Sequence, residues 1–408
     1  MVMTRRAPDS CPGVLRLHDA ADGPLARIRV PGGRLGPVQV QTLAEAAHDL
    51  ADGNIELTSR GNVQLRQVRD AGALTDRLAA AGLLPSSTHE RVRNIIASPL
   101  SGRIGGSADV HPLVPVLDAG LRAAPRLAQL PGRVLFTLDD GRGDVSGLGA
   151  DIGVHAVGRD EFALLLAGGD SGVRVAAADA VDVMLAAAHG FLRLRGDDAG
   201  RWRLRDIERG AERVVDLLGL SPGAERLHFC PPRSIPIGWL EQDNGLVGLG
   251  AGVRLGSLPA RTAEFLAAVE RPVFLTPWRS LVVTDLEEWA AEQVVRVLAP
   301  MGLIFDADSP WLLVSACAGQ PGCAKSHTDV RADVAAAIDT GRVLPARTEQ
   351  AESPVSGTSA GQDVPQAMPP TDVAVAGRQH WSGCARRCGR PQGEVTDIVA
   401  TDEGYRVD

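Results

Sequence analysis

Residues 23–68 read GPLARIRVPGGRLGPVQVQTLAEAAHDLADGNIELTSRGNVQLRQV, and their pattern returns later in the chain. Residues 245–283 read GLVGLGAGVRLGSLPARTAEFLAAVERPVFLTPWRSLVV. In each copy, an apolar strand leads to a glycine turn that ends in Arg-Leu-Gly. An amphipathic helix follows, and then a second strand that ends near Leu-Thr, with an arginine just beyond it. This internal repetition predicts one supersecondary unit that is used twice.

Each copy continues into another helical stretch, at residues 70–83 and 285–303. The order β-α-β-α with short loops predicts an α+β fold in which a ferredoxin-like half-domain occurs twice. Two larger α/β halves alternate with these half-domains. The predicted boundaries are 12–84 and 235–304 for the half-domains, and 85–228 and 305–408 for the larger halves.

The first larger half shows its own pattern. Strands are predicted at residues 133–138, 151–157 and 161–168, and helices at 173–194 and 203–220. Residues 345–371 are rich in Pro, Ser, Gly and Gln, which is typical of a flexible insert that cannot bury a core.

Composition excludes several classes of protein. The chain has 408 residues, 44% of them hydrophobic and 23% charged, which indicates a globular protein of about two to four domains. No apolar run reaches about 18 residues, and the first residues lack the apolar core of a secretory signal, so we expect a cytoplasmic protein without a membrane span. The net charge of −8 argues against non-specific binding of nucleic acid.

The basic residues are almost all arginine, because Lys325 is the only lysine among 42 basic residues. Any carboxylate or phosphate that this protein binds must therefore be held mostly by planar guanidinium groups.

Four of the six cysteines form two close pairs, Cys317 with Cys323 and Cys384 with Cys388. A cytoplasmic chain of this size does not need disulfides, and clustered cysteines there more often hold a metal. Structural zinc favours two to four residues between paired ligands, which the five-residue gap after Cys317 fits poorly. Both pairs lie among Gly, Ala and Ser, whose small side chains let backbone amides approach inorganic sulfide. The pattern favours a [4Fe-4S] cluster, with structural zinc or unligated thiols as alternatives.

These features together resemble the nitrite/sulfite reductase superfamily. The sequence TSRGNVQL at residues 58–65 is similar to its half-domain motif, and RNII at 93–96 is similar to its Arg-Asn segment. The cysteine pairs match as well, so the resemblance covers roughly residues 12–405. It implies a pseudo-twofold, sulfite-reductase-like arrangement in which the four paired cysteines ligate one [4Fe-4S] cluster.

The resemblance also implies a set of residues that bind a tetrapyrrole. Arginines would bind the acidic side chains of the tetrapyrrole, and two amide side chains would orient these groups through hydrogen bonds. The matching positions are Arg27, Arg29, Arg60, Gln64, Arg93, Asn94 and Arg133. No catalytic residue is assigned.

The cysteine motifs Ala316-Cys317-Ala318-Gly319 and Ser382-Gly383-Cys384-Ala385 are similar to those of one branch of the superfamily, the precorrin-3B synthases. This resemblance implies an enzyme that hydroxylates precorrin-3A at ring carbon C20 with O2 and closes a lactone during aerobic cobalamin biosynthesis. The strand predicted at 133–138 offers one arginine followed by apolar residues, whereas a reductase needs concentrated positive charge around its oxyanion.

Two other readings stay open: a sirohaem-dependent nitrite or sulfite reductase, and a non-catalytic iron–sulfur electron-transfer protein. No nicotinamide or flavin motif is visible, so we expect electrons to arrive from a separate reductase. Because the repeat lets one chain build both halves, a monomer is expected. A mononuclear non-haem iron is a further possible cofactor, but the nearby His327, Asp329 and His380 are not assigned as its ligands.

Overall fold

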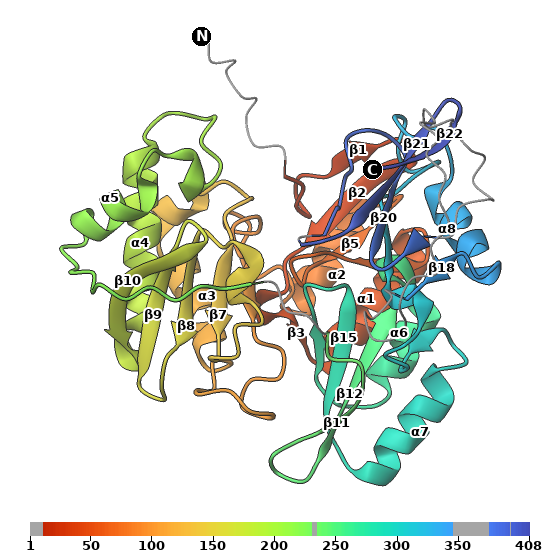
Figure 1. The fold of residues 1–408 in the computed structure, drawn as a ribbon, viewed down its shortest axis with the longest axis horizontal. Helices are drawn as coiled ribbons and strands as arrows, with labels where there is room; N and C mark the ends of the chain where they lie inside the picture. The colour runs from red at the N-terminus through yellow and green to blue at the C-terminus, as the bar shows by residue number, and fades with distance from the viewer. Residues whose placement is uncertain (1–10, 231–234, 346–374, 392) are drawn as a thin grey trace, which may run out of the picture. The chain divides into compact units, whose positions relative to one another are not determined.

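The two copies of the repeat form two sheets that exchange a strand (Figure 1). The computed structural model describes residues 11–230, 235–345, 375–391 and 393–408. The first sheet has the order β1 (His18–Ala20), β2 (Gly23–Ile28), β5 (Val63–Leu65), β4 (Asn54–Leu57) and β13 (Ser257–Pro259). The second has the order β11 (Gly238–Glu241), β12 (Val247–Val253), β15 (Ser280–Leu286), β14 (Val273–Leu275) and β3 (Arg34–Leu35), and β16 (Leu303–Ile304) also pairs with β12.

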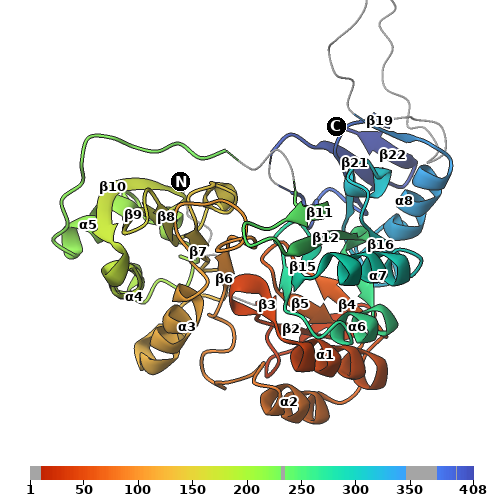
Figure 2. The same cartoon turned by 90° about the horizontal axis from the view of Figure 1, so that it is seen from below.

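A short strand, within the first Arg-Leu-Gly turn and directly after the second, therefore joins the sheet of the other half-domain. Arg34 lies opposite Phe274, and Ser257 lies opposite Glu56, both in antiparallel register. The helices that follow the turns, α1 (Pro37–Leu50) and α6 (Ala260–Ala267), pack against each other (Figure 2). The second helices of the repeats are α2 (Ala71–Ala80) and α7 (Glu288–Leu298). One apolar core, built from both half-domains, joins them.

The predicted α+β fold is confirmed, and the larger half after α2 carries a mixed sheet. Its order is β10 (Gly169–Ala176), β9 (Glu161–Leu166), β8 (Ile152–Ala156), β7 (Phe136–Asp139) and β6 (Ile95–Ala97). The pairs of β6 with β7 and of β7 with β8 are parallel, and the other two pairs are antiparallel. The helices of this half are α3 (Leu113–Ala123), α4 (Ala180–Arg195) and α5 (Gly210–Leu217).

Three predicted elements in this half were wrong in extent, and one of them is the helix expected over 203–220, of which α5 covers only Gly210–Leu217. The strand expected from Arg133 begins only at Phe136, because Gly132 and Arg133 form a turn and the Leu135 amide donates to the Asp151 carboxylate. The helix expected over 173–194 begins at Ala180. Val173 and Val175 instead lie in β10, with their side chains in the core.

The C-terminal part is a separate compact unit that comprises Asp306–Asp408 together with Ala20–Asp22. Its sheet has the order β17 (Val314–Ala316), β20 (Gln379–Ser382), β21 (Thr396–Thr401) and β22 (Gly404–Val407). Helix α8 (Val330–Asp339) follows β17, and β18 (Val343–Leu344) pairs with β19 (Val375–Ala376). Residues 346–374 lie outside the described residues, and with them nearly all of the insert predicted at 345–371. Among the described residues, no helix is both long and apolar enough to cross a membrane.

Candidate anion site and cysteine site

Two predicted arginines lie close together in the chain, Arg27 within β2 and Arg29 just after its end at Ile28. Arg27 pairs in register with Gln64 of β5, and the Arg27 Nε donates to the Gln64 Oε1 at 2.9 Å. The amide nitrogen of Gln64 in turn donates to Glu56 at 3.4 Å. Because residues two apart share a face of a strand, Arg29 follows on the same side as Arg27. The sequence-predicted pair of Arg27 and Gln64 is thus brought together.

Arg29 is the most buried of the predicted arginines. Its residue is 3% exposed, and its Nε donates to the Arg91 carbonyl at 3.2 Å. Its Nη1 is buried without a hydrogen-bond partner among the described residues. Burial, followed by the charge of Arg27, lowers the pKa of Arg29 to about 9. A buried cationic donor of this kind fits an anionic ligand that would accept its hydrogen bond.

Arg60 lies in the turn between β4 and β5. The Thr58 hydroxyl holds this turn by accepting from the backbone amides of Arg60 at 3.3 Å and Asn62 at 3.1 Å. The Arg60 Nη1 donates to the Arg133 carbonyl at 3.1 Å. Burial and then the charge of Arg203 lower the pKa of Arg60 to about 10. Guanidinium groups therefore gather here, since the charge of Arg60 also acts on Arg29.

Arg133 is exposed, unlike Arg29, and its guanidinium lies over the Trp202 ring, 4.4 Å from the ring centroid. That distance is within the range of a cation–π interaction. The main chain of Arg133 thus contacts Arg60, while its side chain contacts Trp202.

Arg93 and Asn94 lie in a different setting, where both side chains are engaged by the protein itself. Arg93 is 4% exposed, and its Nε donates to the Asp118 Oδ1 at 2.5 Å. Asn94 is fully buried and donates to the carbonyls of Gly132 at 2.7 Å and Val134 at 3.1 Å. These contacts fasten α3 and the turn before β7 to the segment that contains Arg93.

Several residues near the arginines were not identified from the sequence. The Glu90 carboxylate accepts from the Val14 amide at 2.6 Å and so fixes the N-terminal segment, whose Gly13 carbonyl accepts from the Arg27 amide at 3.1 Å. Asp151 accepts from the Arg203 Nε at 2.6 Å. None of these residues belongs to a recognisable motif, so no signal in a single sequence pointed to them.

The four paired cysteines lie together in the C-terminal unit. Strands β17 and β20 run parallel with Ala316 opposite Trp381, so their carboxyl ends deliver Cys317 and Cys384 to one edge of the sheet. Burial raises the pKa of Cys388, and the negative charge of the thiolates at Cys384, Cys317 and Cys323 adds to the rise. The four thiols are therefore close enough to interact, and none of them forms a disulfide.

The cysteine loops fit a cluster in two respects. The Gly383 amide donates to the Cys317 sulfur at 3.2 Å, which is the kind of contact that small flanking residues were expected to permit. A Cβ at Gly383 would lie 1.7 Å from the Ser326 hydroxyl, so the two cysteine loops approach each other too closely for a side chain there. Thiolates held with amide donors suit an iron–sulfur cluster.

The polar residues beside the cysteines have partners within the unit. Asp329 caps α8 by accepting from the Ala332 amide at 3.2 Å, and His327 contacts Asp402 through Nδ1 at 2.8 Å. The His380 Nδ1 lies 3.0 Å from the Ser315 hydroxyl. These contacts hold the cysteine loops in place.

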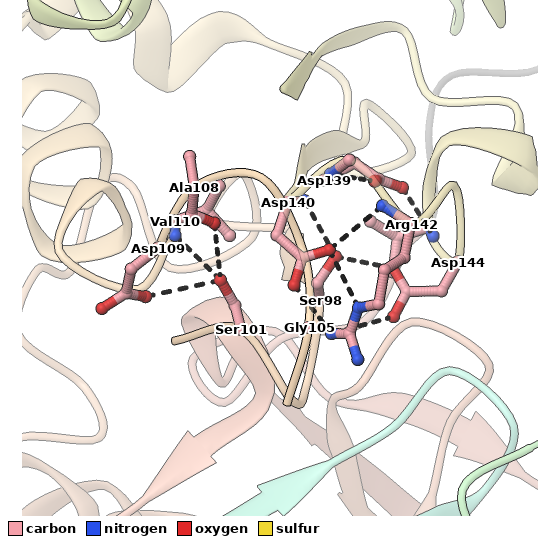
Figure 3. A network of polar contacts seen from close by, with 12 residues as sticks. Ser98, Ser101, Gly105, Ala108, Asp109, Val110, Asp139, Asp140, Arg142 and Asp144 are labelled. Carbon is pink, nitrogen blue, oxygen red and sulfur yellow. Dashed lines mark hydrogen bonds and ion pairs between the residues drawn. The ribbon is translucent and has the colours of Figure 1, made fainter. Parts of the chain in front are cut away.

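A third polar group lies at the end of β7, where Asp139, Asp140 and Asp144 come together (Figure 3). Asp139 accepts from four backbone amides of the following loop, and Asp140 is bound by Arg142 at 2.7 Å. Burial alone would raise the pKa of Asp139, but His155 and the loop amides lower it to about 2. The network holds the loop after β7 in shape.

Comparison with known proteins agrees with this fold. Residues 18–81 match the nitrite/sulfite reductase ferredoxin-like half domain. A precorrin-3B synthase of Sinorhizobium sp is 25% identical over 97% of this chain and 81% of its own length. The predicted resemblance to the nitrite/sulfite reductase superfamily is confirmed.

Two further proteins are similar over most of the chain. A ferredoxin–nitrite reductase of Synechococcus elongatus is 26% identical over 92% of this chain and 75% of its own length. The structure of the Mycobacterium tuberculosis NirA protein superposes with a TM-score of 0.71 at 19% identity, covering 94% of this chain and 74% of that one. At that identity, this likeness establishes the fold alone.

Proposed function

We propose that this protein is an iron–sulfur oxidoreductase that binds an acidic tetrapyrrole and acts as a precorrin-3B synthase. The observation that carries the proposal is Arg29, a buried guanidinium with an unpaired Nη1 among the described residues, next to Arg27 and Arg60. The charges of Arg27 and Arg60 both lower the pKa of Arg29, and cations gathered in this way favour a ligand with several carboxylates. A precorrin, with its acetate and propionate side chains, is such a ligand.

The arginines would bind the substrate without forming covalent bonds. Each bidentate contact between a guanidinium and a carboxylate contributes about 1.5–3 kcal/mol. Gln64 would hold Arg27 in its orientation, as it already does through its Oε1. Arg93 and Asn94 would act indirectly, because their hydrogen bonds shape the segment beside the site.

Cys317, Cys323, Cys384 and Cys388 would hold one [4Fe-4S] cluster, which supplies one-electron transfer when bound. In the proposed reaction, one atom of O2 enters C20 of precorrin-3A and the other leaves as water. Two electrons and two protons are needed for this, and the electrons come from a separate reductase. The chain's own part is to hold the thiolates, with the Gly383 amide donating to Cys317.

A sirohaem-dependent nitrite or sulfite reductase is the second candidate, favoured by the similarity to the Synechococcus nitrite reductase. Two observations weigh against it. Val134, Leu135 and Phe136 are buried and apolar, so the start of β7 offers no cation to a small oxyanion. The buried Arg93 already has its charge balanced by Asp118. A reductase needs uncompensated positive charge where its oxyanion binds.

The test is turnover by anaerobically reconstituted protein supplied with a reductant. With precorrin-3A and isotopically labelled O2, we expect one labelled oxygen atom in a lactone product. R29A should lose at least tenfold in substrate affinity, because a single charge-assisted contact is worth at least about 1.4 kcal/mol. R261A is the matched control, since Arg261 is an exposed arginine on α6.

Nitrite and sulfite consumption is measured on the same samples. Reduction of either anion without conversion of precorrin-3A would replace the proposal with the second candidate. Equal affinity of R29A and the wild type for precorrin-3A would remove Arg29 from the site.

A further inference from the structure

We propose that Trp202 is a positioning residue of the tetrapyrrole site, one that acts by holding the guanidinium of Arg133. This inference rests on the proposed function and extends it to a segment that no motif or comparison assigns. Its starting point is the stacking of Arg133 over the Trp202 ring, 4.4 Å from the ring centroid. An exposed arginine has many rotamers, and a fixed aromatic face restricts them before a ligand arrives.

The Trp202 segment is itself firmly held. The backbone amides of Trp202 and Arg203 both donate to the Asp206 carboxylate at 3.0 Å. The Trp202 indole nitrogen donates to the Ala199 carbonyl at 3.1 Å. The ring is therefore a fixed platform.

The buried Asp151 joins this segment to the rest of the site. Its carboxylate accepts from the Leu204 amide at 2.8 Å, from the Arg203 Nε at 2.6 Å and from the Leu135 amide at 2.9 Å. Leu135 lies two residues beyond Arg133. One carboxylate thus fixes both the turn that carries Arg133 and the segment that carries Trp202.

The charges explain why such a platform is useful. Arg60 donates to the Arg133 carbonyl, and the largest effect of any charge on the pKa of Arg60 comes from another cation, Arg203. Neighbouring guanidinium groups repel one another, so an unrestrained Arg133 side chain would turn away from them. Stacking on Trp202 holds the Arg133 guanidinium in one orientation, so that a polycarboxylate can contact it together with Arg60, which is bound to the main chain of the same residue.

The experiment is a double-mutant cycle on binding, with uroporphyrin as the probe because all its side chains are acetates or propionates. Fluorescence titration gives the dissociation constants of the wild type, W202L, R133A and W202L/R133A. Leucine keeps an apolar side chain at the position, which protects folding, but it has no aromatic face. We expect W202L and R133A each to bind about three- to tenfold more weakly.

The interaction between the two residues gives the decisive readout. If Trp202 acts through Arg133, the double variant binds no more weakly than R133A, and W202F restores nearly wild-type affinity. F265L is the matched control, because Phe265 lies under Arg261 in a similar pair 4.7 Å apart on α6. F265L should bind like the wild type.

Two outcomes would overturn the inference. In the first, W202L binds uroporphyrin like the wild type although R133A binds it more weakly. In the second, the fold-loss of affinity in the double variant equals the product of the two single losses, so the residues act independently. R29A in the same titration separates this from failure of the proposed function. If R29A also binds uroporphyrin like the wild type, the tetrapyrrole site itself is wrong. If R29A binds uroporphyrin more weakly than the wild type and W202L does not, only the proposed role of Trp202 is contradicted.

Discussion

At the scale of single residues, the environment separates arginines that look equivalent in the sequence. Arg29 and Arg93 were both predicted as carboxylate ligands. Arg29 is buried with an unpaired Nη1 among the described residues, whereas Arg93 is bound by Asp118. Asp118 lies on α3, 25 residues further along the chain, and this pairing depends on how α3 packs. Local sequence therefore predicted residue types for a site, but it could not say which charges the fold neutralises.

Asp144 allows a prediction on the pH dependence of stability. Burial, and then the charge of Asp139, raises the pKa of Asp144 from 3.8 to about 6. Folding therefore favours the protonated form, and this contribution to stability is fully present below about pH 4 and is lost as the pH rises through about 6.

The substitution D144N removes the charge and keeps an oxygen that can accept from Ser98. We expect D144N to be about 1–3 kcal/mol more stable than the wild type at neutral pH, and this advantage should disappear near pH 4. Urea unfolding at both pH values measures it, with D216N on the exposed face of α5 as the control. A D144N variant that is no more stable than the wild type at neutral pH would contradict the prediction.

At the scale of elements, the exchange of β3 and β13 between the half-domain sheets depends on close backbone contact. Gly33 has φ of +69°, and a Cβ there would lie 2.1 Å from the Leu275 carbonyl oxygen. Gly256, which directly precedes β13 as Gly33 directly precedes β3, has φ of +73°, and a Cβ there would lie 3.3 Å from the Leu57 carbonyl oxygen of the other sheet. Both positions favour glycine for conformation, and Gly33 requires it for space as well.

We expect G33A to lose at least about 3 kcal/mol of stability, because both strain and a backbone clash oppose it. Gly53 is the matched control, since it has φ of +88° but nothing within 4 Å of its Cβ position. G53A should lose only about 1 kcal/mol. Denaturant unfolding compares the two variants, and equal losses would show that the strand exchange tolerates a side chain at Gly33.

The elements also show what the sequence could and could not specify. The repeat in residues 23–68 and 245–283 predicted both half-domains, but not that a short strand within or directly after each Arg-Leu-Gly turn would pair with the other half's sheet. That pairing links strands far apart in the chain, which local periodicity does not record. The helix expected over 173–194 included Val173 and Val175, but apolar residues two apart share a face of a strand and not of a helix, and the pairing of β10 with β9 makes this segment a strand.

At the scale of the whole molecule, the arginines and the cysteines belong to separate compact units. The cysteine loops follow β17 and β20 within the small C-terminal unit. Metal binding to such loops stabilises the unit that holds them, because the thiolates are brought together only in the folded state.

We therefore expect iron removal to act mainly on the C-terminal unit. After chelation, hydrogen exchange should rise in β17, β20 and α8, while β2, β4 and β5 keep their protection. Mass spectrometry of peptic fragments from reconstituted and chelated protein measures this. An equal rise in both units would mean that the cluster supports the whole chain.

The central claim is that this chain joins one iron–sulfur cluster to a site for an acidic tetrapyrrole. The most direct measurement is the visible spectrum of anaerobically reconstituted wild type and C384S, with iron, sulfide and extractable tetrapyrrole determined on the same samples. We predict a broad brown iron–sulfur absorption in the wild type, its loss together with most of the iron in C384S, and no extractable sirohaem. Unchanged iron and sulfide in C384S would contradict the cluster assignment, and a sirohaem band would contradict the precorrin function in favour of nitrite or sulfite reduction.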